Sequence, residues 1–277
     1  MSIKKVQNEE RIAYVIPGEG ARGAAQARIL QWLADKGIKP DAIYGVSSGA
    51  INACGYSYLG PERLCELWSG LNSISKVFQL NYLTFPWALG LTNPSPISRI
   101  LDREIPPGTT PKYSSAHIAA MERLSTKLVW GSTDDMPAEA FKRLTLGAVA
   151  IPGLVTPTDG LIDAGARLLA PLARPIEDGY RKIVVVSGTP VGVVPKAREG
   201  SLMPSLFQGL NFVNVLLDEL MLRDIRKCLS KNFREGYDHV DITMYAPTEY
   251  LYDSLDFSEV DRGLSCTVAE QDIYSIQ

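Results

Sequence analysis

The sequence predicts an α/β protein with a mostly parallel central sheet flanked by helices, on the strength of three observations. First, a β-branched run at residues 11–16 leads into a glycine-rich loop and then into an amphipathic helical stretch. Second, another apolar run follows at residues 42–44, and the order strand, helix, strand implies parallel strands with a right-handed crossover. Third, 277 residues with 45% hydrophobic and 21% charged residues are ordinary for a folded domain with a well-filled core.

The other elements follow from the same periodicities. Runs rich in β-branched residues indicate strands, and apolar residues at helical spacing indicate helices. Gly37 is placed to end the first helix, because glycine tolerates a left-handed helix cap. Strands are expected at residues 11–16, 42–44, 117–121, 127–131, 161–162, 183–186 and 240–245. Helices are expected around residues 29–33 and at residues 48–54, 62–71, 94–105, 137–149 and 203–229, with a loop at residues 151–157.

No repeat, low-complexity tract or clear linker divides the chain. Residues 1–277 are therefore expected to form one domain, with its core at about residues 11–250. A segment at about residues 77–93 is apolar and almost uncharged, and Pro86 and Gly90 within it argue against one continuous helix. This segment is expected either to be an apolar cap that touches lipid or to be a core segment folded over the sheet.

The composition indicates which partners and which cellular compartment to expect. The net charge of −3 gives no reason to expect nucleic acid or an anionic membrane as a partner. Cys54, Cys65, Cys228 and Cys266 show neither a C-x-x-C pair nor a metal-ligand spacing, which favours free thiols in a reducing compartment. Residues 1–11 lack the apolar core of a signal peptide, and no apolar run is long enough to span a bilayer. These features predict a cytoplasmic protein.

The stretch around Ser47 carries the clearest chemical signal. Residues 45–49 read GVSSG, with a strand-like run before them and a helix-like run after them. This is the G-x-S-x-G nucleophile elbow, which exposes a serine hydroxyl on a strained turn. Gly45 and Gly49 remove side chains that would collide with the neighbouring strand and helix. The helix that begins at Ser48 directs its free N–H groups and positive dipole end toward the oxyanion that attack by Ser47 would create.

The glycine-rich loop at residues 18–23, with the sequence GEGARG, is the second chemical feature. Its N–H groups lie at a strand end and a helix start, which suits negative charge. Such loops also cradle phosphates, so a nucleotide site is one interpretation and a plain tight turn is another. An oxyanion hole beside Ser47 is the favoured interpretation, because the first two strands of a β-α-β unit can lie side by side.

A serine hydroxyl also needs a base to take its proton. The chain has two histidines, His117 and His239, and His239 would complete the chain order Ser47, Asp163, His239 of an α/β-hydrolase triad. Against this triad, the nucleophile follows the second strand, which is very early for that fold. In the alternative, Asp163 acts directly on Ser47 as a dyad. A carboxylate with a pKa near ~3.9 is a weak base, so burial or a bond that tightens in the transition state must then assist it.

Taken together, the motifs resemble those of the patatin-like phospholipase family, cytosolic phospholipase relatives included. The family has a G-G-G-x-[RK]-G loop, a G-x-S-x-G elbow and a D-G-[GA] aspartate, which correspond to residues 18–23, 45–49 and 163–165. Residues 148–157 also resemble the family's A-x-x-x-P-x-x-x-x-P approach to the aspartate. The resemblance covers roughly residues 11–175, and three motifs in the same order make it specific.

The resemblance implies a three-layer α/β/α patatin-like fold and a lipid acyl hydrolase of the phospholipase A or esterase type, without metal or cofactor. Ser47 would be the nucleophile, Asp163 its base and Arg22 a contact to lipid phosphate or a brace for the loop. The expected oxyanion donors are the N–H groups of Gly18, Glu19, Gly20 and Ser48. The substrate would be a phospholipid or another acyl lipid, with peripheral contact to a membrane. A homo-oligomer is neither required nor excluded.

Two residues depart from the family pattern. Glu19 replaces the middle glycine of the loop and brings a carboxylate near a site meant to hold an anion, and Ala164 replaces the glycine after the aspartate. Glu19 therefore keeps a second hypothesis open, in which the chain is a catalytically silent binding or assembly module with the same fold. Arg22 would pair with Glu19 or be a solvated residue at the helix start.

Overall fold

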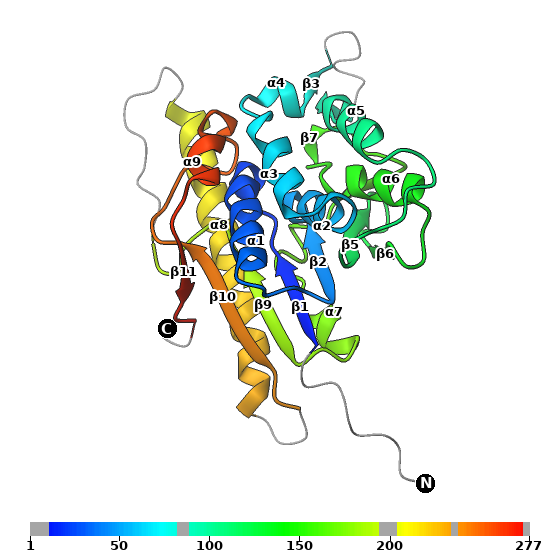
Figure 1. Cartoon of the computed structure of the whole chain (residues 1–277). Coiled ribbons are helices and arrows are strands. Elements are labelled where there is room, and N and C mark those ends of the chain that lie inside the picture. The colour runs from blue at the N-terminus through cyan, green and yellow to red at the C-terminus, as the bar shows by residue number, and fades with distance from the viewer. Residues whose placement is uncertain (1–10, 82–88, 194–203, 234–237, 274–277) are drawn as a thin grey trace.

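A central sheet with helices on both faces organises the computed structural model, which describes residues 11–81, 89–193, 204–233 and 238–273 (Figure 1). The strands of this sheet are β1 (Ile12–Ile16), β2 (Ala42–Val46), β5 (Ser115–Glu122), β6 (Leu128–Ser132), β8 (Leu161–Asp163), β9 (Lys182–Val186), β10 (Asp241–Pro247) and β11 (Val268–Gln271). Their order is β11-β10-β9-β1-β2-β5-β6, and β8 also pairs with β5. Strands β10, β9, β1, β2 and β5 are parallel, whereas β11, β6 and β8 run antiparallel to their neighbours.

Alternation along the strands places a hydrophobic core on each face of the sheet. Tyr14 and Ile16 of β1 pack with the helices on one face, whereas Ala13 and Val15 pack against α8 on the other, as the two-residue period of a strand requires. Figure 1 shows α1, α2 and α3 in front of the sheet and α8 behind it. The helices are α1 (Gly23–Asp35), α2 (Ser48–Leu59), α3 (Pro61–Ser69), α4 (Ile74–Val77), α5 (Ser95–Glu104), α6 (Ala138–Ala148), α7 (Ala173–Glu177), α8 (Pro204–Leu229) and α9 (Val260–Leu264). The predicted mostly parallel sheet between helical layers is confirmed.

The predicted β-α-β unit at the start of the chain is also confirmed. Strands β1 and β2 pair in parallel from Ala13↔Ala42 to Ile16↔Gly45, and α1 connects them. Gly37 adopts a φ of +77°, and its N–H donates to the carbonyl of Ala34 at 2.9 Å, so it follows the helix as the sequence predicts. One connection was expected to be a loop but contains a strand: residues 151–157 include β7 (Gly153–Val155).

Strand β7 belongs to a second, small sheet with β3 (Gln79–Leu80) and β4 (Gly90–Asn93), next to α4. The predicted apolar segment at about 77–93 supplies two of these strands, and its residues 82–88 lie outside the described residues. Val77 and Phe78 are buried in the core, whereas Leu80, Leu89 and Leu91 are about half exposed. The buried part agrees with a core segment folded over the sheet, and contact of the exposed part with lipid stays a prediction. In the part of the chain that the structure describes, no helix has the length and apolarity needed to cross a bilayer.

The register around β5 brings the ends of β2 and β8 together. Strand β6 pairs with β5 from His117 to Met121, so β8, which pairs with Ala120 to Glu122, must use the opposite edge. Strand β2 occupies that same edge up to Val46, which pairs with Ala119. Strand β2 leaves this edge of β5 after Val46 and turns into α2, and β8 pairs with the next part of the same edge. Because β8 is antiparallel to β5, its chain runs toward the end of β2. Its last residue is Asp163.

Candidate active site

Ser47 occupies a strained turn between β2 and α2. Its φ of 55° and ψ of −127° lie outside the conformations that residues with a side chain usually adopt, and such strain costs about 1–3 kcal/mol and clusters at functional sites. A Cβ on Gly49 would lie 2.1 Å from the carbonyl oxygen of Ile16, and one on Gly45 would lie 2.2 Å from that of Gly49. The predicted role of both glycines is confirmed, because the turn has no room for their side chains.

Asp163 faces this turn from the end of β8. Its side chain is buried, and its Oδ1 accepts a hydrogen bond from the N–H of Gly165 at 2.7 Å. Burial raises the pKa of Asp163 to about 6, and hydrogen bonding from the Ser47 hydroxyl and from the Gly165 N–H opposes part of that rise.

Two cavities meet at Ser47. The first has about 830 Å³ of empty space, open solvent at its mouth included, and it brings Ser47 and Asp163 together with Gly18, Gly20 and Leu217. The second has about 410 Å³ on the same measure and is walled by apolar side chains of α2, α3 and α4. The sequence-predicted nucleophile, its candidate base and two glycines of the loop thus share one concave site.

The glycine-rich loop lies against the nucleophile. A Cβ on Gly18 would lie 2.7 Å from the Cβ of Ser47, and Gly20, with a φ of +60°, packs against the backbone of Ser254. The loop has the G-x-G-x-x-G spacing of some phosphate-binding loops, yet the N–H of Ala21 already donates to the carbonyl of Ser254 at 2.6 Å. Ser254 therefore packs against the loop at Gly20 and Ala21 and engages one of its N–H groups.

The four expected oxyanion donors differ in their availability. The N–H of Glu19 donates to the Oγ of Ser48 at 2.9 Å, so in this structure it is engaged. The N–H of Gly18 makes a long hydrogen bond of 3.4 Å to the carbonyl of Leu169. Among the hydrogen bonds of the described residues, none uses the N–H of Gly20 or Ser48. Gly20 and Ser48 are therefore the donors best placed to meet an incoming negative charge.

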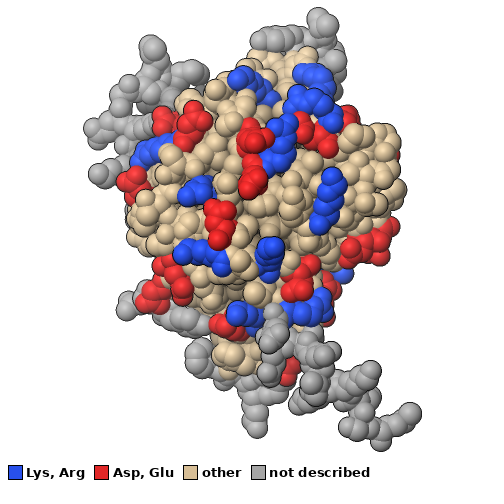
Figure 2. Space-filling view, in the orientation of Figure 1, with Lys and Arg blue, Asp and Glu red and all other residues tan. Residues whose placement is uncertain are grey.

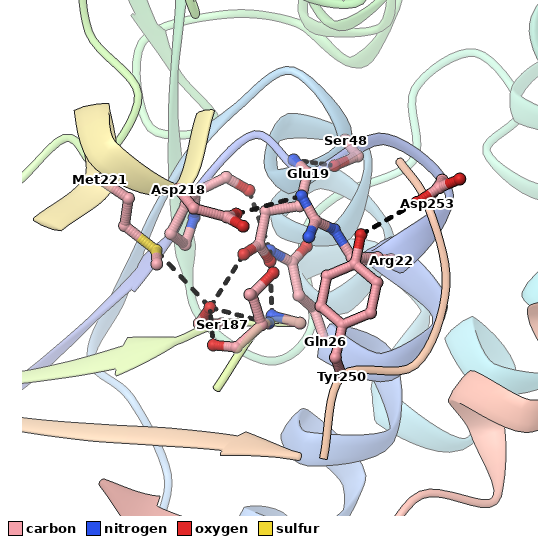
Figure 3. Close-up of polar contacts among 12 residues, drawn as sticks. Glu19, Arg22, Gln26, Ser48, Ser187, Asp218, Met221, Tyr250 and Asp253 are labelled. Atoms are coloured by element: carbon pink, nitrogen blue, oxygen red, sulfur yellow. Dashed lines mark hydrogen bonds and ion pairs between the residues drawn. The ribbon is translucent and has the colours of Figure 1, made fainter. Parts of the chain in front are cut away.

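The carboxylate of Glu19 points away from the nucleophile and into a buried polar cluster (Figure 3). It accepts hydrogen bonds from the Gln26 amide at 2.7 Å, from the Ser187 hydroxyl at 2.9 Å and from the N–H of Gly188. The nearby positive charge of Arg22 offsets its negative charge. The expectation that this carboxylate adds charge to the anion site is therefore wrong, because the side chain joins the loop to the end of β9.

Arg22 is fully buried, so the expectation of a solvated residue is wrong as well. Its Nη2 pairs with Asp218 of α8 at 3.3 Å, and its guanidinium lies 5.7 Å from the centre of the Tyr250 ring. The neighbouring negative charges raise its pKa and outweigh the desolvation that would lower it. Arg22 lines neither cavity at Ser47, which favours its predicted role as a brace for the loop over contact with a lipid phosphate.

Neither histidine reaches Ser47. His239 is exposed and precedes β10 at the amino-terminal edge of the parallel strands, whereas Ser47 follows β2 at the carboxyl-terminal edge. At 3.3 Å per strand residue the two edges lie roughly 20 Å apart. His117 stacks on Tyr44, with the ring centres 4.6 Å apart, and its Nε2 lies 3.1 Å from the Oγ of Ser115. The Ser47–Asp163–His239 triad is therefore incompatible with the sheet register.

Sequence reasoning missed the polar residues that support the loop from behind. Gln26, on α1, contacts Glu19, and its amide oxygen accepts from Asn52 of α2 at 3.0 Å. Asn52 in turn accepts from the indole N–H of Trp68 at 2.7 Å. One sequence signal was available, because Gln26 and Asn52 are uncharged polar residues within otherwise small and apolar helix faces.

Comparison with known proteins identifies the family of the chain. The family model described as patatin-like phospholipase matches residues 14–173, which is more than half of the chain. The chain belongs to the patatin-like phospholipase family. Among solved structures, VipD from Legionella pneumophila is similar over 95% of this chain and 68% of its own, with 11% sequence identity and a TM-score of 0.48. No curated protein matches the sequence.

The second departure from the patatin-like phospholipase pattern, Ala164, fits the backbone without strain. Among the described residues, the non-glycine positions with positive φ are Ser47, Thr126 and Asp159. Ala164 is fully buried beside Val46 and Ile162, so its methyl group adds to the core. Lipid acyl hydrolysis is the activity of the family, and neither departure disturbs the residues that meet at Ser47.

Proposed function

We propose that this patatin-like phospholipase is a lipid acyl hydrolase in which Ser47 is the nucleophile and Asp163 the general base. The observation that supports the proposal most strongly is the register around β5. In this register β8 pairs with β5 directly beyond the end of β2. The buried carboxylate of Asp163 therefore lies opposite the hydroxyl of Ser47, which is held on a strained turn. Both groups line one cavity whose other walls are largely apolar, which suits an acyl ester.

In the proposed reaction, the Oγ of Ser47 attacks the ester carbonyl carbon while Asp163 takes the hydroxyl proton. The C–O bond to the leaving alcohol then breaks, and Asp163 returns the proton to the departing oxygen. A water molecule then attacks the acyl-serine ester and gives a proton to Asp163. The bond between the acyl carbon and the Oγ of Ser47 breaks, Asp163 returns the proton to that Oγ, and a fatty acid is released. The unengaged N–H groups of Gly20 and Ser48, with the positive end of α2, stabilise the oxyanion formed in each step.

The pH dependence of the reaction follows from the pKa of Asp163. A base must be deprotonated, and burial raises the pKa of this carboxyl to about 6. For a soluble ester, kcat/KM is therefore expected to fall about tenfold per pH unit below that pKa and to be nearly constant above it. A pH–rate profile of the free enzyme measures this directly. A profile that stays flat down to about pH 5 would remove Asp163 as the base.

We further propose peripheral contact with a lipid surface through the small sheet and α4. Ile74, Leu80 and Leu91 are each about half exposed there, and Leu89 is slightly more so. This patch adjoins the active site, because Val77 and Phe78 of the same segment line a cavity at Ser47. Apolar side chains at the mouth of a lipid-binding site are expected to enter the boundary between head groups and acyl chains.

Hydrolysis of two substrates tests activity and surface contact together. The wild type is expected to release fatty acid from phosphatidylcholine vesicles and nitrophenol from p-nitrophenyl butanoate, and Ser47→Ala is expected to release neither. The double variant Leu80→Asp/Leu91→Asp is expected to lose vesicle hydrolysis at least about tenfold more than butanoate hydrolysis, since it weakens surface binding. Equal activity of Ser47→Ala and wild type would refute the hydrolase. Equal loss on both substrates would refute the surface contact.

The face drawn in Figure 2 carries charges of both signs. Lysine and arginine side chains are interspersed there with aspartate and glutamate. Nucleic-acid binding needs a field of one sign, and this face offers none. We also propose that the protein is cytoplasmic and contacts membranes from the cytoplasmic side, and its four free cysteines support this location. Cell fractionation that recovers the protein in a cytosolic and a membrane-associated pool would agree, and an extracellular location would not.

The alternative of a catalytically silent module rested on the position of Glu19. Its carboxylate is directed toward Gln26 and Ser187 and away from Ser47, so it does not occupy the place of the oxyanion. The silent module therefore loses the feature that favoured it.

A further inference from the structure

Ser48 brings two polar groups to the site, and the proposed reaction uses one of them, its N–H. The other is its hydroxyl, whose Oγ accepts a hydrogen bond from the N–H of Glu19 at 2.9 Å (Figure 3). Among the hydrogen bonds of the described residues, none has the Ser48 hydroxyl as its donor. Because a serine hydroxyl can accept and donate at the same time, this proton is available to a further acceptor, although Ser48 is only 5% exposed.

The two cavities at Ser47 separate Ser48 from the candidate base. One cavity is lined by Gly20, Ser47 and Ser48 but not by Asp163, whereas the other is lined by Asp163 but not by Ser48. During attack the serine proton leaves toward the base, and the carbonyl oxygen, which gains negative charge, turns toward the donors of the oxyanion hole. Ser48 therefore lies on the side of Ser47 where the negative charge develops.

The N–H of Glu19 is held in its present direction. The carboxylate of Glu19 accepts hydrogen bonds from three donors. One of these donors, the Gln26 amide, also donates to the carbonyl of Pro17 at 2.9 Å, two residues earlier in the chain. A glycine, which the family pattern has in place of Glu19, lacks this anchor and leaves the backbone freer to turn. The anchored Glu19 therefore keeps its N–H on the Ser48 hydroxyl.

We propose that the side-chain hydroxyl of Ser48 is an oxyanion donor that takes the place of a direct hydrogen bond from the Glu19 N–H. The oxyanion accepts from the N–H groups of Gly20 and Ser48 and from this hydroxyl, while the Glu19 N–H donates to the hydroxyl oxygen. The bond from the N–H polarises the hydroxyl and strengthens it as a donor, and no proton is transferred from Ser48. This assignment rests on the proposed hydrolase function and adds a catalytic side chain to it.

Ser48→Ala removes the hydroxyl and keeps the backbone N–H. For p-nitrophenyl butanoate, kcat is expected to fall about 10²-fold, as on loss of one oxyanion donor, whereas KM is expected to stay within about threefold. Ser48→Thr keeps a hydroxyl and is expected to retain at least about one tenth of the wild-type kcat. Ser57→Ala is the matched control, because it makes the same change near the other end of α2, where the hydroxyl donates to the carbonyl of Ser114. Its kcat is expected to stay within about twofold.

Two ketone inhibitors separate the loss of a donor from a general disturbance of the site. An alkyl trifluoromethyl ketone adds to a serine nucleophile and then carries an oxyanion, whereas the alkyl methyl ketone of the same length binds as a neutral ketone. Ser48→Ala is expected to weaken the trifluoromethyl ketone at least about tenfold more than the methyl ketone. Because an inhibition constant is a concentration, it does not depend on how much of a variant is folded.

Three results would overturn the assignment and leave the hydrolase standing. An unchanged kcat in Ser48→Ala would show that the hydroxyl takes no part in the reaction. A higher kcat would show that the hydroxyl blocks the Glu19 N–H from the oxyanion. Equal weakening of the two ketones would show that Ser48 only shapes the site. A wild type that neither hydrolyses the ester nor binds the trifluoromethyl ketone would refute the hydrolase, and the assignment with it.

Discussion

Asp163→Asn is expected to lower kcat/KM for ester hydrolysis by about 10²–10⁴-fold, because an amide cannot accept the proton of Ser47. The change keeps the shape of the side chain, and the amide oxygen can still accept from the N–H of Gly165, now at 2.7 Å from the carboxylate. Burial disfavours the charged carboxylate, so a neutral amide in the same place is not expected to unfold the protein. Steady-state kinetics and a urea unfolding curve of the same preparation separate the two effects.

Two control variants make this result specific. Asp159→Asn applies the same chemical change four residues earlier, where the carboxylate is partly exposed and pairs with Arg143, and it is expected to keep kcat/KM within about twofold. His239→Ala is expected to do the same, since His239 lies at the far edge of the sheet. Activity of Asp163→Asn above about one tenth of the wild type would contradict the dyad.

Glu19→Ala is expected to lower the free energy of unfolding by about 3–5 kcal/mol. The carboxylate is buried and accepts hydrogen bonds from Gln26, Ser187 and Gly188. Its removal would leave these three donors without their acceptor and Arg22 without a nearby negative charge. Unpaired polar groups in the interior lose water without regaining a partner, which is why removing one member of a buried cluster is costly.

Glu19→Gln separates charge from shape in this cluster. The amide oxygen can serve two of the donors, but the amide N–H₂ would face the Gln26 amide, so an intermediate loss of about 1–3 kcal/mol is expected. Glu177→Ala, an exposed position at the end of α7, is the control and is expected to change stability by less than about 0.5 kcal/mol. Urea unfolding of the three variants measures the series. A Glu19→Ala protein as stable as the wild type would show that the cluster does not brace the loop.

Local patterns in the sequence were sufficient for the first part of the fold and for the nucleophile. Strand β1, helix α1, the elbow and Gly37 follow from periodicity and turn chemistry within about forty residues of chain, and the structure confirms their conformations. The order of the motifs identified Asp163 as a candidate. What brings Asp163 to Ser47 is the short antiparallel strand β8 on the edge that β2 vacates, and three residues of strand carry no sequence signal for their pairing.

The surroundings of the oxyanion loop could not be predicted for a related reason. The partners of Glu19 at Ser187 and Gly188, and the partner of Arg22 at Asp218, are separated from them by 168, 169 and 196 residues. The packing of β9 and α8 against β1 brings such pairs together. In the sequence, a charged loop residue that becomes buried therefore looks the same as one that stays exposed. The apolar segment at 77–93 was ambiguous because its buried part and its exposed part alternate within a few residues.

Covalent labelling tests the central claim, that Ser47 is a nucleophile activated by Asp163, most directly. An alkyl fluorophosphonate is expected to react with the wild type, and peptide mass spectrometry should locate the adduct on Ser47. The labelling rate is expected to fall at least about 10²-fold in Asp163→Asn and to be unchanged in His239→Ala. A wild-type protein without an adduct on Ser47, or an adduct that forms equally fast in Asp163→Asn, would contradict the account.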